Sequence, residues 1–333
     1  MKRVVAGTAG IAVLLLAAPA AFLWHYRSSS IAGLSSPATV EIPSGQSLYQ
    51  TAGRLHRAGV LQHPRVFVWM TRLEGRAHRI QAGEYRFEPG TTPDQVLDKL
   101  VAGKVVRHHV TLVEGWEFHR VMQTLEHDDA LKHTLDGLGP EQIMARLGHP
   151  DQKPQGRFFP DTYSFPRGTT DLEILRRAYQ KMQTVLRQEW KKRASNLPLK
   201  TPYQALTLAS IIEKETGKPG ERARIAGVFI RRLRRGMRLQ TDPTVIYGMG
   251  SSYHGDLHAA DLRKNTPYNT YVHKGLPPTP IAMPGRAAIH AALHPAPGHS
   301  LYFVAKGDGS HAFAATLKKH DEQVRRYQLH ENN

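Results

Sequence analysis

Two glutamates at the end of an apolar segment are the residues best suited to chemistry. Residues 201–216 are predicted to form a helix, because Thr201-Pro202-Tyr203-Gln204 has the form of a capping box with proline at the first helical position. The segment is apolar nearly all round and should be buried. Burial and a helix C-terminus both disfavour an ionised carboxylate. Glu213 or Glu215 is therefore expected to keep a proton near neutral pH, as a general acid must.

The spacing of the two glutamates excludes their use as a facing pair. They lie two residues apart, so on a helix they point roughly 200° away from each other. Periodicity does not indicate which of them faces a cleft. An alternative is that both form ion pairs with neighbouring cations, namely Lys214, Arg222 and Arg224.

Polar and aromatic side chains follow in two short strings. Gln240, Thr241 and Asp242 precede Pro243, which predicts a rigid loop that hydrogen-bonds a ligand. The second string is 266–271. Amide, hydroxyl and aromatic groups together are typical of a sugar-binding groove, and ordinary turns with surface tyrosines are the alternative. The side chains selected for substrate positioning are Glu215, Gln240, Thr241, Asp242, Tyr247, Asn269 and Tyr271.

The elements that must position these residues predict an α+β protein. In the first part, strands are expected at 39–42, 83–87 and 105–113, and helices after Ser47, His63 and Thr92. Residues 116–147 are predicted to be mostly helical. Further helices are expected at 171–193, 201–216 and 221–234.

Composition narrows the function classes. The formal net charge of the 333 residues is +17, which favours a polyanionic partner or surface. The densest basic cluster, Arg231 to Arg238, is interpreted as the solvated face of a helix. The absence of cysteine excludes disulfides, thiolate metal sites and a cysteine nucleophile.

The N-terminal segment predicts export. Lys2 and Arg3 precede an uncharged run from Val4 to Trp24, long enough to cross the hydrocarbon layer, and Trp24 and Tyr26 lie where interfacial aromatic residues are expected. A cleaved signal peptide ending near residues 18–20 is the alternative. Both interpretations place residues 28–333 outside the cytoplasm.

Several motifs resemble one family. Glu213-Lys214-Glu215-Thr216, the string from Arg238 to Gly248, Thr266 to Tyr271 and Gly275 to Pro278 are similar to the endolytic murein transglycosylases of the MltG (YceG-like) family. Phe159 to Tyr163 and Leu301 to Ala305 match as well. The resemblance implies an N-terminal transmembrane helix, a small LysM-like α+β subdomain and a mixed α+β catalytic domain. The expected boundaries are 1–27 for the anchor, 28–38 for a linker, 39–113 for the LysM-like subdomain and 114–333 for the catalytic domain.

The resemblance also implies an activity. It places the acid/base catalyst at Glu213 and predicts a lyase that cleaves the MurNAc–GlcNAc β-1,4 bond within nascent peptidoglycan strands. The products would be 1,6-anhydro-MurNAc ends, and glycan elongation would stop. Expected partners are glycan strands, peptidoglycan synthases and the bacterial inner membrane, with the catalytic domain in the periplasm and no metal or cofactor. The chain departs from the family pattern at Gln155, where glutamate is usual, and at Thr279, where glycine is frequent.

The sequence leaves three alternative functions open. One is a non-catalytic glycan-binding scaffold that recruits synthases. Another is a nucleic-acid binder, which export and the lack of a helix-turn-helix or RNP signature disfavour. The third is a metal hydrolase using some of the 19 histidines, but these are scattered and no H-E-x-x-H spacing occurs.

Overall fold

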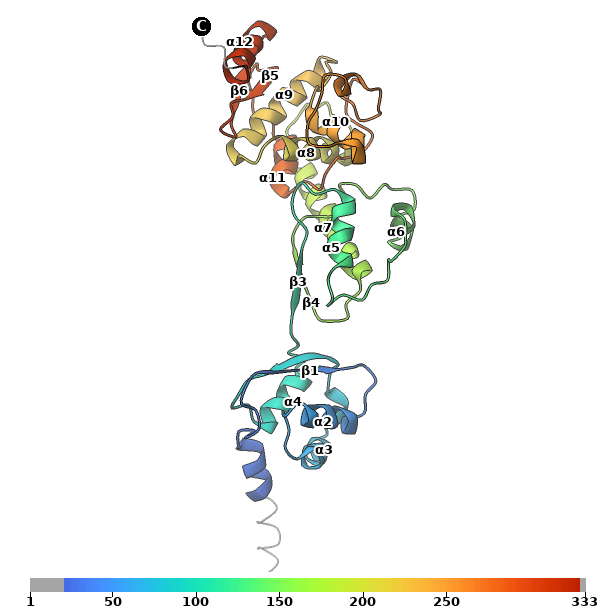
Figure 1. The fold of residues 1–333 in the computed structure, drawn as a ribbon, viewed down its shortest axis with the longest axis vertical. Helices are drawn as coiled ribbons and strands as arrows, with labels where there is room; N and C mark the ends of the chain where they lie inside the picture. The colour runs from blue at the N-terminus through green and yellow to red at the C-terminus, as the bar shows by residue number, and fades with distance from the viewer. Residues whose placement is uncertain (1–20, 330–333) are drawn as a thin grey trace, which may run out of the picture. The chain divides into compact units, whose positions relative to one another are not determined.

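The computed structural model describes residues 21–329 (Figure 1), and the chain divides into two compact units. One unit runs to His108 and includes Ser164–Gly168, and the other comprises His109–Tyr163 and the chain from Thr169 onward. The division falls within strands β3 (His108–Thr111) and β4 (Thr162–Phe165), which pair in a two-stranded sheet. The secondary structure is mixed α+β, as predicted.

The N-terminal unit packs helices around one antiparallel strand pair. Strand β1 (Ala38–Ile42) pairs with β2 (Gly83–Phe87), and Val40 lies opposite Tyr85. The helical elements are α2 (Leu48–Arg57), α3 (Pro64–Leu73), the 3-10 turn η1 (Ala77–Arg79) and α4 (Pro93–Val101). Leu55, Phe67, Phe87 and Leu100 are fully buried between them. Burial of these apolar side chains holds the unit together.

Local capping signals set the ends of these helices. The Ser47 hydroxyl accepts from the N–H of Gln50, whose side chain in turn accepts from the N–H of Ser47. The same reciprocal box joins Thr92 and Gln95 at the start of α4. Each box satisfies donors that a helix start otherwise leaves unpaired. The predicted helix starts are confirmed here.

The segment before β1 is part of this unit. Residues 21–28 are helical, and the Tyr26 hydroxyl donates to the His63 carbonyl at 3.2 Å while burial raises the pKa of Tyr26 to about 12. Ile31 and Leu34, within the expected linker, are 5% and 6% exposed and belong to the core. Along residues 21–329, no helix combines the length and the apolar character needed to cross a membrane. The predicted anchor falls mostly on residues 1–20, which lie outside the described part.

The prediction that residues 116–147 are mostly helical is wrong for the middle of this stretch. Helix α5 (Phe118–Glu126) and helix α6 (Pro140–Arg146) are separated by a segment without helix. The buried carboxylate of Asp171 accepts hydrogen bonds from the backbone N–H groups of Thr134 and Leu135. These tertiary bonds replace the helical ones, which local periodicity cannot reveal.

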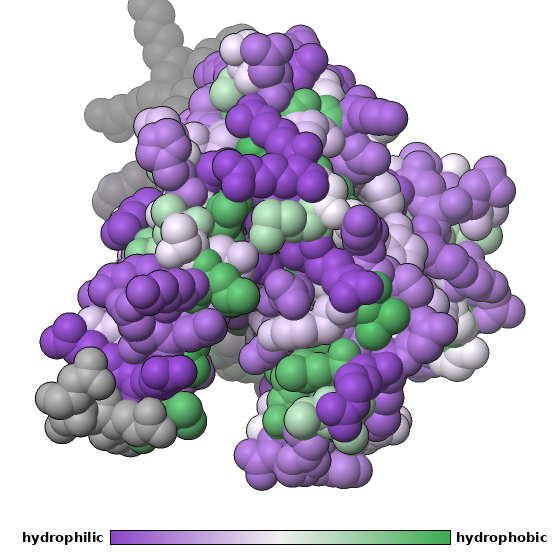
Figure 2. Space-filling view, turned by 90° about the horizontal axis from the view of Figure 1, so that it is seen from above, coloured by the Kyte–Doolittle hydropathy of each residue, from purple (hydrophilic) through white to green (hydrophobic). Residues whose placement is uncertain are grey.

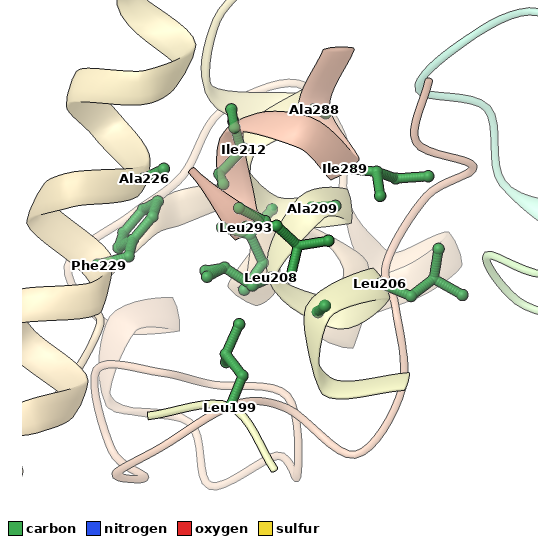
Figure 3. Close-up of a cluster of buried hydrophobic side chains, with 14 of the residues drawn as sticks. Leu199, Leu206, Leu208, Ala209, Ile212, Ala226, Phe229, Ala288, Ile289 and Leu293 are labelled. Carbon is green, nitrogen blue, oxygen red and sulfur yellow. The ribbon is translucent and has the colours of Figure 1, made fainter. Parts of the chain in front are cut away.

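Helix α8 (Pro202–Glu215) lies at the centre of the C-terminal unit. It contacts α7 (Asp171–Lys191), α9 (Arg222–Arg234), α10 (Asp242–Met249) and α11 (Arg286–Leu293). Figure 3 shows Leu208 and Ile212 of α8 among Phe229 of α9 and Leu293 of α11. Residues 205–212 of α8 are all buried, and this fixes the position of the helix that carries the two glutamates.

The remaining elements of this unit lie in the C-terminal third of the chain. They are the 3-10 turns η2 (Pro219–Glu221), η3 (Gly250–Ser252) and η4 (Asp261–Arg263), the antiparallel strands β5 (Tyr302–Ala305) and β6 (His311–Ala314), and helix α12 (Leu317–Tyr327). Helix α12 packs on both strands but has no fully buried residue. Hydrophilic side chains dominate the face drawn in Figure 2, with hydrophobic ones in small groups.

Two local predictions around the candidate site need correction. The predicted loop at Gln240 and Thr241 is present, but it ends at Thr241. Helix α10 begins at Asp242, because Pro243 and an acidic first residue are favourable at a helix start. The cap at Thr201 is also only half of the predicted box. Gln204 donates its N–H to the Thr201 hydroxyl, but its side-chain oxygen accepts from the N–H of Lys200 at 2.6 Å.

Candidate active site

Glu213 lies in the last turn of α8 and joins it to the start of α11. Its Oε2 accepts a hydrogen bond from the N–H of Gly285 at 2.8 Å, and its Oε1 lies 3.6 Å from the Arg222 guanidinium. The side chain is 6% exposed. Burial raises the pKa of Glu213, the Gly285 N–H opposes this, the nearby Glu114 carboxylate raises it further and Arg222 lowers it. The ion-pair alternative left open by the sequence is met in part, because Arg222 lies near Glu213, but burial outweighs this contact and the pKa of Glu213 stays raised.

Glu215 has a different environment. Its Oε1 accepts a hydrogen bond from the Thr241 hydroxyl. The residue is only partly buried. Burial raises the pKa of Glu215 to about 7, the Thr241 hydroxyl opposes this, Asp242 adds to it and Arg232 lowers it. Near neutral pH this carboxyl exists in both protonation states, which suits a group that must donate and then accept a proton.

A cavity of about 460 Å³ opens beside Glu215. This volume lies within the range of small-ligand sites. Among the residues selected from the sequence, Glu215, Gln240, Thr241, Asp242 and Tyr271 line it. Glu213 is not among its lining residues. The structure thus brings most of the predicted substrate-binding side chains together, but around the second glutamate of the motif instead of the first.

Tyr271 and Asp242 form a pair at the wall of the cavity. The Tyr271 hydroxyl donates to Oδ1 of Asp242 at 2.5 Å. Burial raises the pKa of Tyr271, and the Asp242 carboxylate raises it further, so the phenol stays protonated. The pair holds the Asp242 carboxylate in a fixed orientation at an exposed position next to Glu215.

Asn269 supports the cavity without lining it. The side chain is fully buried, and its Nδ2 donates to the carbonyls of Asp261, Leu262 and Lys264 at 3.3, 3.1 and 2.7 Å. Its Oδ1 accepts from the N–H of Tyr271 at 2.9 Å. In this conformation Asn269 positions Tyr271, and it has no surface left for a substrate.

Tyr247 also lies outside the cavity lining. Its ring packs edge-on against Tyr268, with 4.8 Å between the ring centroids. The Tyr268 hydroxyl forms a hydrogen bond of 3.0 Å with Thr279, the position where the chain departs from the usual glycine. The other departure, Gln155, accepts from the N–H of Phe118 at 2.9 Å and does not line the cavity. Both unusual residues make contacts within the fold.

Arg232 is a cavity residue that the sequence interpretation missed. It is 7% exposed, although the cluster Arg231 to Arg238 was expected to be solvated. Its guanidinium donates to the carbonyls of Leu301 and Leu239 at 2.6 and 2.7 Å and lies over the Tyr302 ring. Backbone carbonyls near β5 thus draw this cation inward. Its position could not follow from helix periodicity.

Gln240 has an unusual backbone conformation. Its φ angle is 50°, in the left-handed region that residues other than glycine rarely adopt. Its N–H donates to the Thr270 carbonyl at 3.1 Å, and its side-chain oxygen accepts from Arg232 at 3.3 Å. These bonds hold the turn immediately before Thr241 and Asp242.

A further part of the cavity wall comes from residues 302–328. Tyr302 and Phe303 of β5, His311 of β6, and His320, Asp321 and Val324 of α12 all line it. The matched string Leu301 to Ala305 hinted at β5, but no sequence signal pointed to α12. Contacts of α12 with β5 and β6 bring it here.

Within residues 21–329, two side-chain clusters have the residue types of a metal site. Glu189, His290 and His294 place ligand atoms within 4.8 Å of one another, and His133, Asp136 and Asp171 do the same. In the first cluster, Oε1 of Glu189 is bound to Arg286 at 2.7 Å and Oε2 to His290 at 3.0 Å. A guanidinium bound to Glu189 disfavours a further cation there. The contacts of Glu189 with Arg286 and His290 instead join α7 to α11.

Comparisons with known proteins support the family that the sequence motifs resemble. The model of the YceG-like family matches residues 40–326. An endolytic murein transglycosylase of Bacillus subtilis is 32% identical over 305 residues, which cover 86% of this chain and 84% of that protein. One from Streptococcus pneumoniae strain D39 is 27% identical over 93% of this chain, and the match spans 62% of that longer protein.

A solved structure is also similar. The crystal structure of a yceG-like protein from Listeria monocytogenes superposes with a TM-score of 0.53 at 30% sequence identity. The match covers 86% of this chain and 99% of that one. With a family match over most of its length, the chain belongs to the YceG-like family.

Proposed function

We propose that this chain is a lytic transglycosylase, a lyase that cleaves the MurNAc–GlcNAc β-1,4 bond within nascent peptidoglycan strands. The products are strands with 1,6-anhydro-MurNAc ends, and the cut ends glycan elongation. Relatives named endolytic murein transglycosylases support the reaction class. The Glu215 cavity supports the mechanism, because it combines one proton-holding carboxyl with amide, hydroxyl and aromatic groups.

Glu215 is the proposed acid/base catalyst, in place of the Glu213 expected from the sequence. The single observation that carries this assignment is that Glu215, and not Glu213, lines a cavity large enough for sugar units. The raised pKa of Glu215, about 7, is consistent with it. Glu213 is held instead by Gly285 and Arg222 and lines no part of this cavity.

The reaction needs one proton donor and one internal nucleophile. The protonated Glu215 carboxyl gives its proton to the glycosidic oxygen while the bond from C1 of MurNAc to that oxygen breaks. The resulting carboxylate then takes the proton of the C6 hydroxyl of the same MurNAc. The C6 oxygen bonds to C1 and closes the anhydro ring, so Glu215 is protonated again and no water is consumed. Intramolecular attack has a high effective concentration, which removes the need for an activated water.

Asp242 has a part in the charge balance. The sugar carries positive charge at C1 in the transition state, as in other glycoside cleavages. The carboxylate of Asp242, oriented by the Tyr271 hydroxyl, supplies negative charge on the same cavity wall. A hydrolase would use such a second carboxylate to activate water, and the product therefore discriminates the two routes.

The membrane arrangement is part of the proposal. Lys2 and Arg3 followed by the apolar run favour a retained single-pass anchor in the inner membrane with the rest of the chain in the periplasm. Nascent strands are made at that surface by peptidoglycan synthases, which are the proposed partners. Two results together support this arrangement. The tagged chain is recovered in washed membranes, and protease digests residues 28–333 only after the periplasm has been opened. Recovery in the soluble periplasmic fraction contradicts the anchor.

A matched pair of variants tests the catalytic assignment. Purified full-length wild-type chain, Glu215→Gln and Glu213→Gln are incubated with uncrosslinked nascent strands, and products are identified by mass spectrometry. Glu215→Gln is expected to release no anhydro-MurNAc ends, whereas Glu213→Gln keeps activity within about tenfold of the wild type, because glutamine still accepts from the Gly285 N–H. Loss in Glu213→Gln with turnover in Glu215→Gln would reverse the assignment.

The same digestion in water enriched in ¹⁸O tests the reaction class. Anhydro ends without ¹⁸O support the intramolecular route. Reducing MurNAc ends that carry ¹⁸O would identify hydrolysis instead, and absence of any cleavage by the wild type would leave the glycan-binding scaffold as the better description.

A further inference from the structure

His320 of α12 lies at the wall of the Glu215 cavity with an unused polar group. Its ring stacks on Tyr302 of β5, with 5.2 Å between centroids and 22° between planes. Its Nδ1 is buried and has no hydrogen-bond partner among residues 21–329. Buried polar atoms in folded proteins are nearly always paired, so each unpaired one calls for an explanation.

The fold itself gives no reason for a histidine at this position. The contact with Tyr302 uses only the flat face of the ring, which a phenylalanine would also provide. Helix α12 has no fully buried residue, so its packing does not depend on this side chain alone. The fold does not use this unpaired nitrogen, and the nitrogen lies beside the cavity that holds the proposed catalyst. This combination indicates that His320 binds a ligand.

We propose that His320 is a substrate-binding residue, whose imidazole hydrogen-bonds a hydroxyl or acetamido group of the glycan held in the Glu215 cavity. The inference rests on the proposed function, and it assigns α12 to the substrate site. A neutral imidazole offers one donor and one acceptor, which match the hydroxyl and amide groups of N-acetylated sugars.

The charges around His320 favour its neutral form. Burial lowers the pKa of His320, Asp321 opposes this and Arg232 lowers it further. The titratable and charged side chains that face the cavity from the surrounding elements are Glu215, Arg232, Asp242, Tyr271, Tyr302, His311, His320 and Asp321. Protonation of His320 adds a second cation beside Arg232 and close to a sugar that becomes positive in the transition state. The kcat/KM of the wild type is therefore expected to fall on the acid side as His320 gains its proton.

The test uses two substitutions at His320 and one matched control on the same helix. His320→Phe keeps the ring stacked on Tyr302 and removes both nitrogens. His320→Gln keeps a hydrogen-bonding group that does not titrate. Lys319→Gln changes an exposed neighbour that pairs with Glu322 on α12 and does not line the cavity. For each full-length variant, kcat and KM on uncrosslinked strands are measured across pH, together with the thermal unfolding midpoint.

The expected results separate binding from folding. His320→Phe lowers kcat/KM about tenfold, as expected for a lost hydrogen bond to substrate, and unfolds at or above the wild-type temperature, since it removes an unpaired buried nitrogen. His320→Gln recovers most of the kcat/KM but loses the acid-side fall. Lys319→Gln matches the wild type. Wild-type kcat/KM and pH profile in His320→Phe would overturn the proposal, as would a loss fully explained by unfolding.

A binding measurement separates this inference from the proposed function. In the Glu215→Gln background, the Kd for uncrosslinked strands is measured with and without His320→Phe. A Kd about tenfold weaker in the double variant supports the histidine contact even if the wild type proves to be a scaffold without lytic activity. Equal Kd values would reject the contact even if Glu215 proves to be the catalyst.

Discussion

The hydroxyl of Thr241 donates a hydrogen bond to the carboxyl of Glu215, which joins the residue before α10 to the end of α8. This bond lowers the pKa of Glu215 against the larger effect of burial. Thr241 therefore reduces the fraction of the Glu215 carboxyl that is protonated at a given pH, and a substitution there should shift the pH profile instead of abolishing activity.

Thr241→Val removes this donor at nearly constant volume. The pKa of Glu215 should rise by up to about one unit, because a neutral hydrogen bond contributes roughly 0.5–1.5 kcal/mol. Activity that needs protonated Glu215 falls as pH rises through this pKa, so the alkaline limb of kcat/KM should move to higher pH. Thr184→Val, at an exposed position whose hydroxyl donates to the Gln180 carbonyl, is the control. An unchanged or lowered alkaline limb contradicts the prediction.

The raised pKa of Glu215 also predicts how stability depends on pH. The carboxyl of Glu215 has a pKa of about 7 in the folded chain against an ordinary value of 4.5, so it favours the folded state fully below pH 4.5. That contribution is lost as pH rises through about 7 and amounts to about 3 kcal/mol. Glu215→Gln does not titrate, so its free energy of unfolding relative to the wild type should increase between pH 4.5 and 8. Urea denaturation at both pH values measures this, and a constant difference argues against a buried, protonated carboxyl.

Asn269 is expected to act through the fold. Asn269→Ala leaves three carbonyls and the Tyr271 N–H without their partner, and should lower the free energy of unfolding by about 3 kcal/mol. Asn265→Ala, which removes only an exposed contact with His273, should cost under about 0.5 kcal/mol. Chemical denaturation compares the two. An Asn269→Ala chain of full stability with weakened glycan binding would restore the direct substrate role predicted from the sequence.

Chelators should not affect the enzyme. Glu189 is already bound by Arg286 and His290, and the proposed reaction uses only Glu215 and groups of the sugar. Incubation with EDTA followed by gel filtration should leave both the rate of anhydro-MurNAc formation and the unfolding temperature unchanged. A loss of either that zinc restores would identify a metal site at Glu189, His290 and His294.

Local signals in the sequence predicted much of the fold. The box at Thr92 and the apolar spacing after Ser47 predicted helices that the structure contains, and the strand at 83–87 was predicted with its observed bounds. The loop 127–139 was missed because Asp171, far along the chain, supplies its hydrogen bonds. Helix α10 was missed because Gln240 to Pro243 was interpreted by side-chain chemistry, although Pro243 also favours a helix start.

The site shows a similar division. The motif residues Gln240, Thr241, Asp242 and Tyr271 do share one cavity, which their residue types suggested. Helix periodicity does not decide between Glu213 and Glu215, because their environments depend on Gly285 and Thr241, which approach α8 from distant segments. The sequence could not predict His320 as a cavity residue for the same reason, because the packing of α12 on β5 brings it to the cavity.

The left-handed backbone of Gln240 bears on any effort to engineer this protein. Glycine at that position would relieve a conformational cost of roughly 1 kcal/mol, so selection for heat resistance alone would favour it. The replacement would also delete the amide that reaches Arg232 at the cavity wall. Libraries screened only for thermal stability should therefore select chains that are more stable but bind the glycan less tightly.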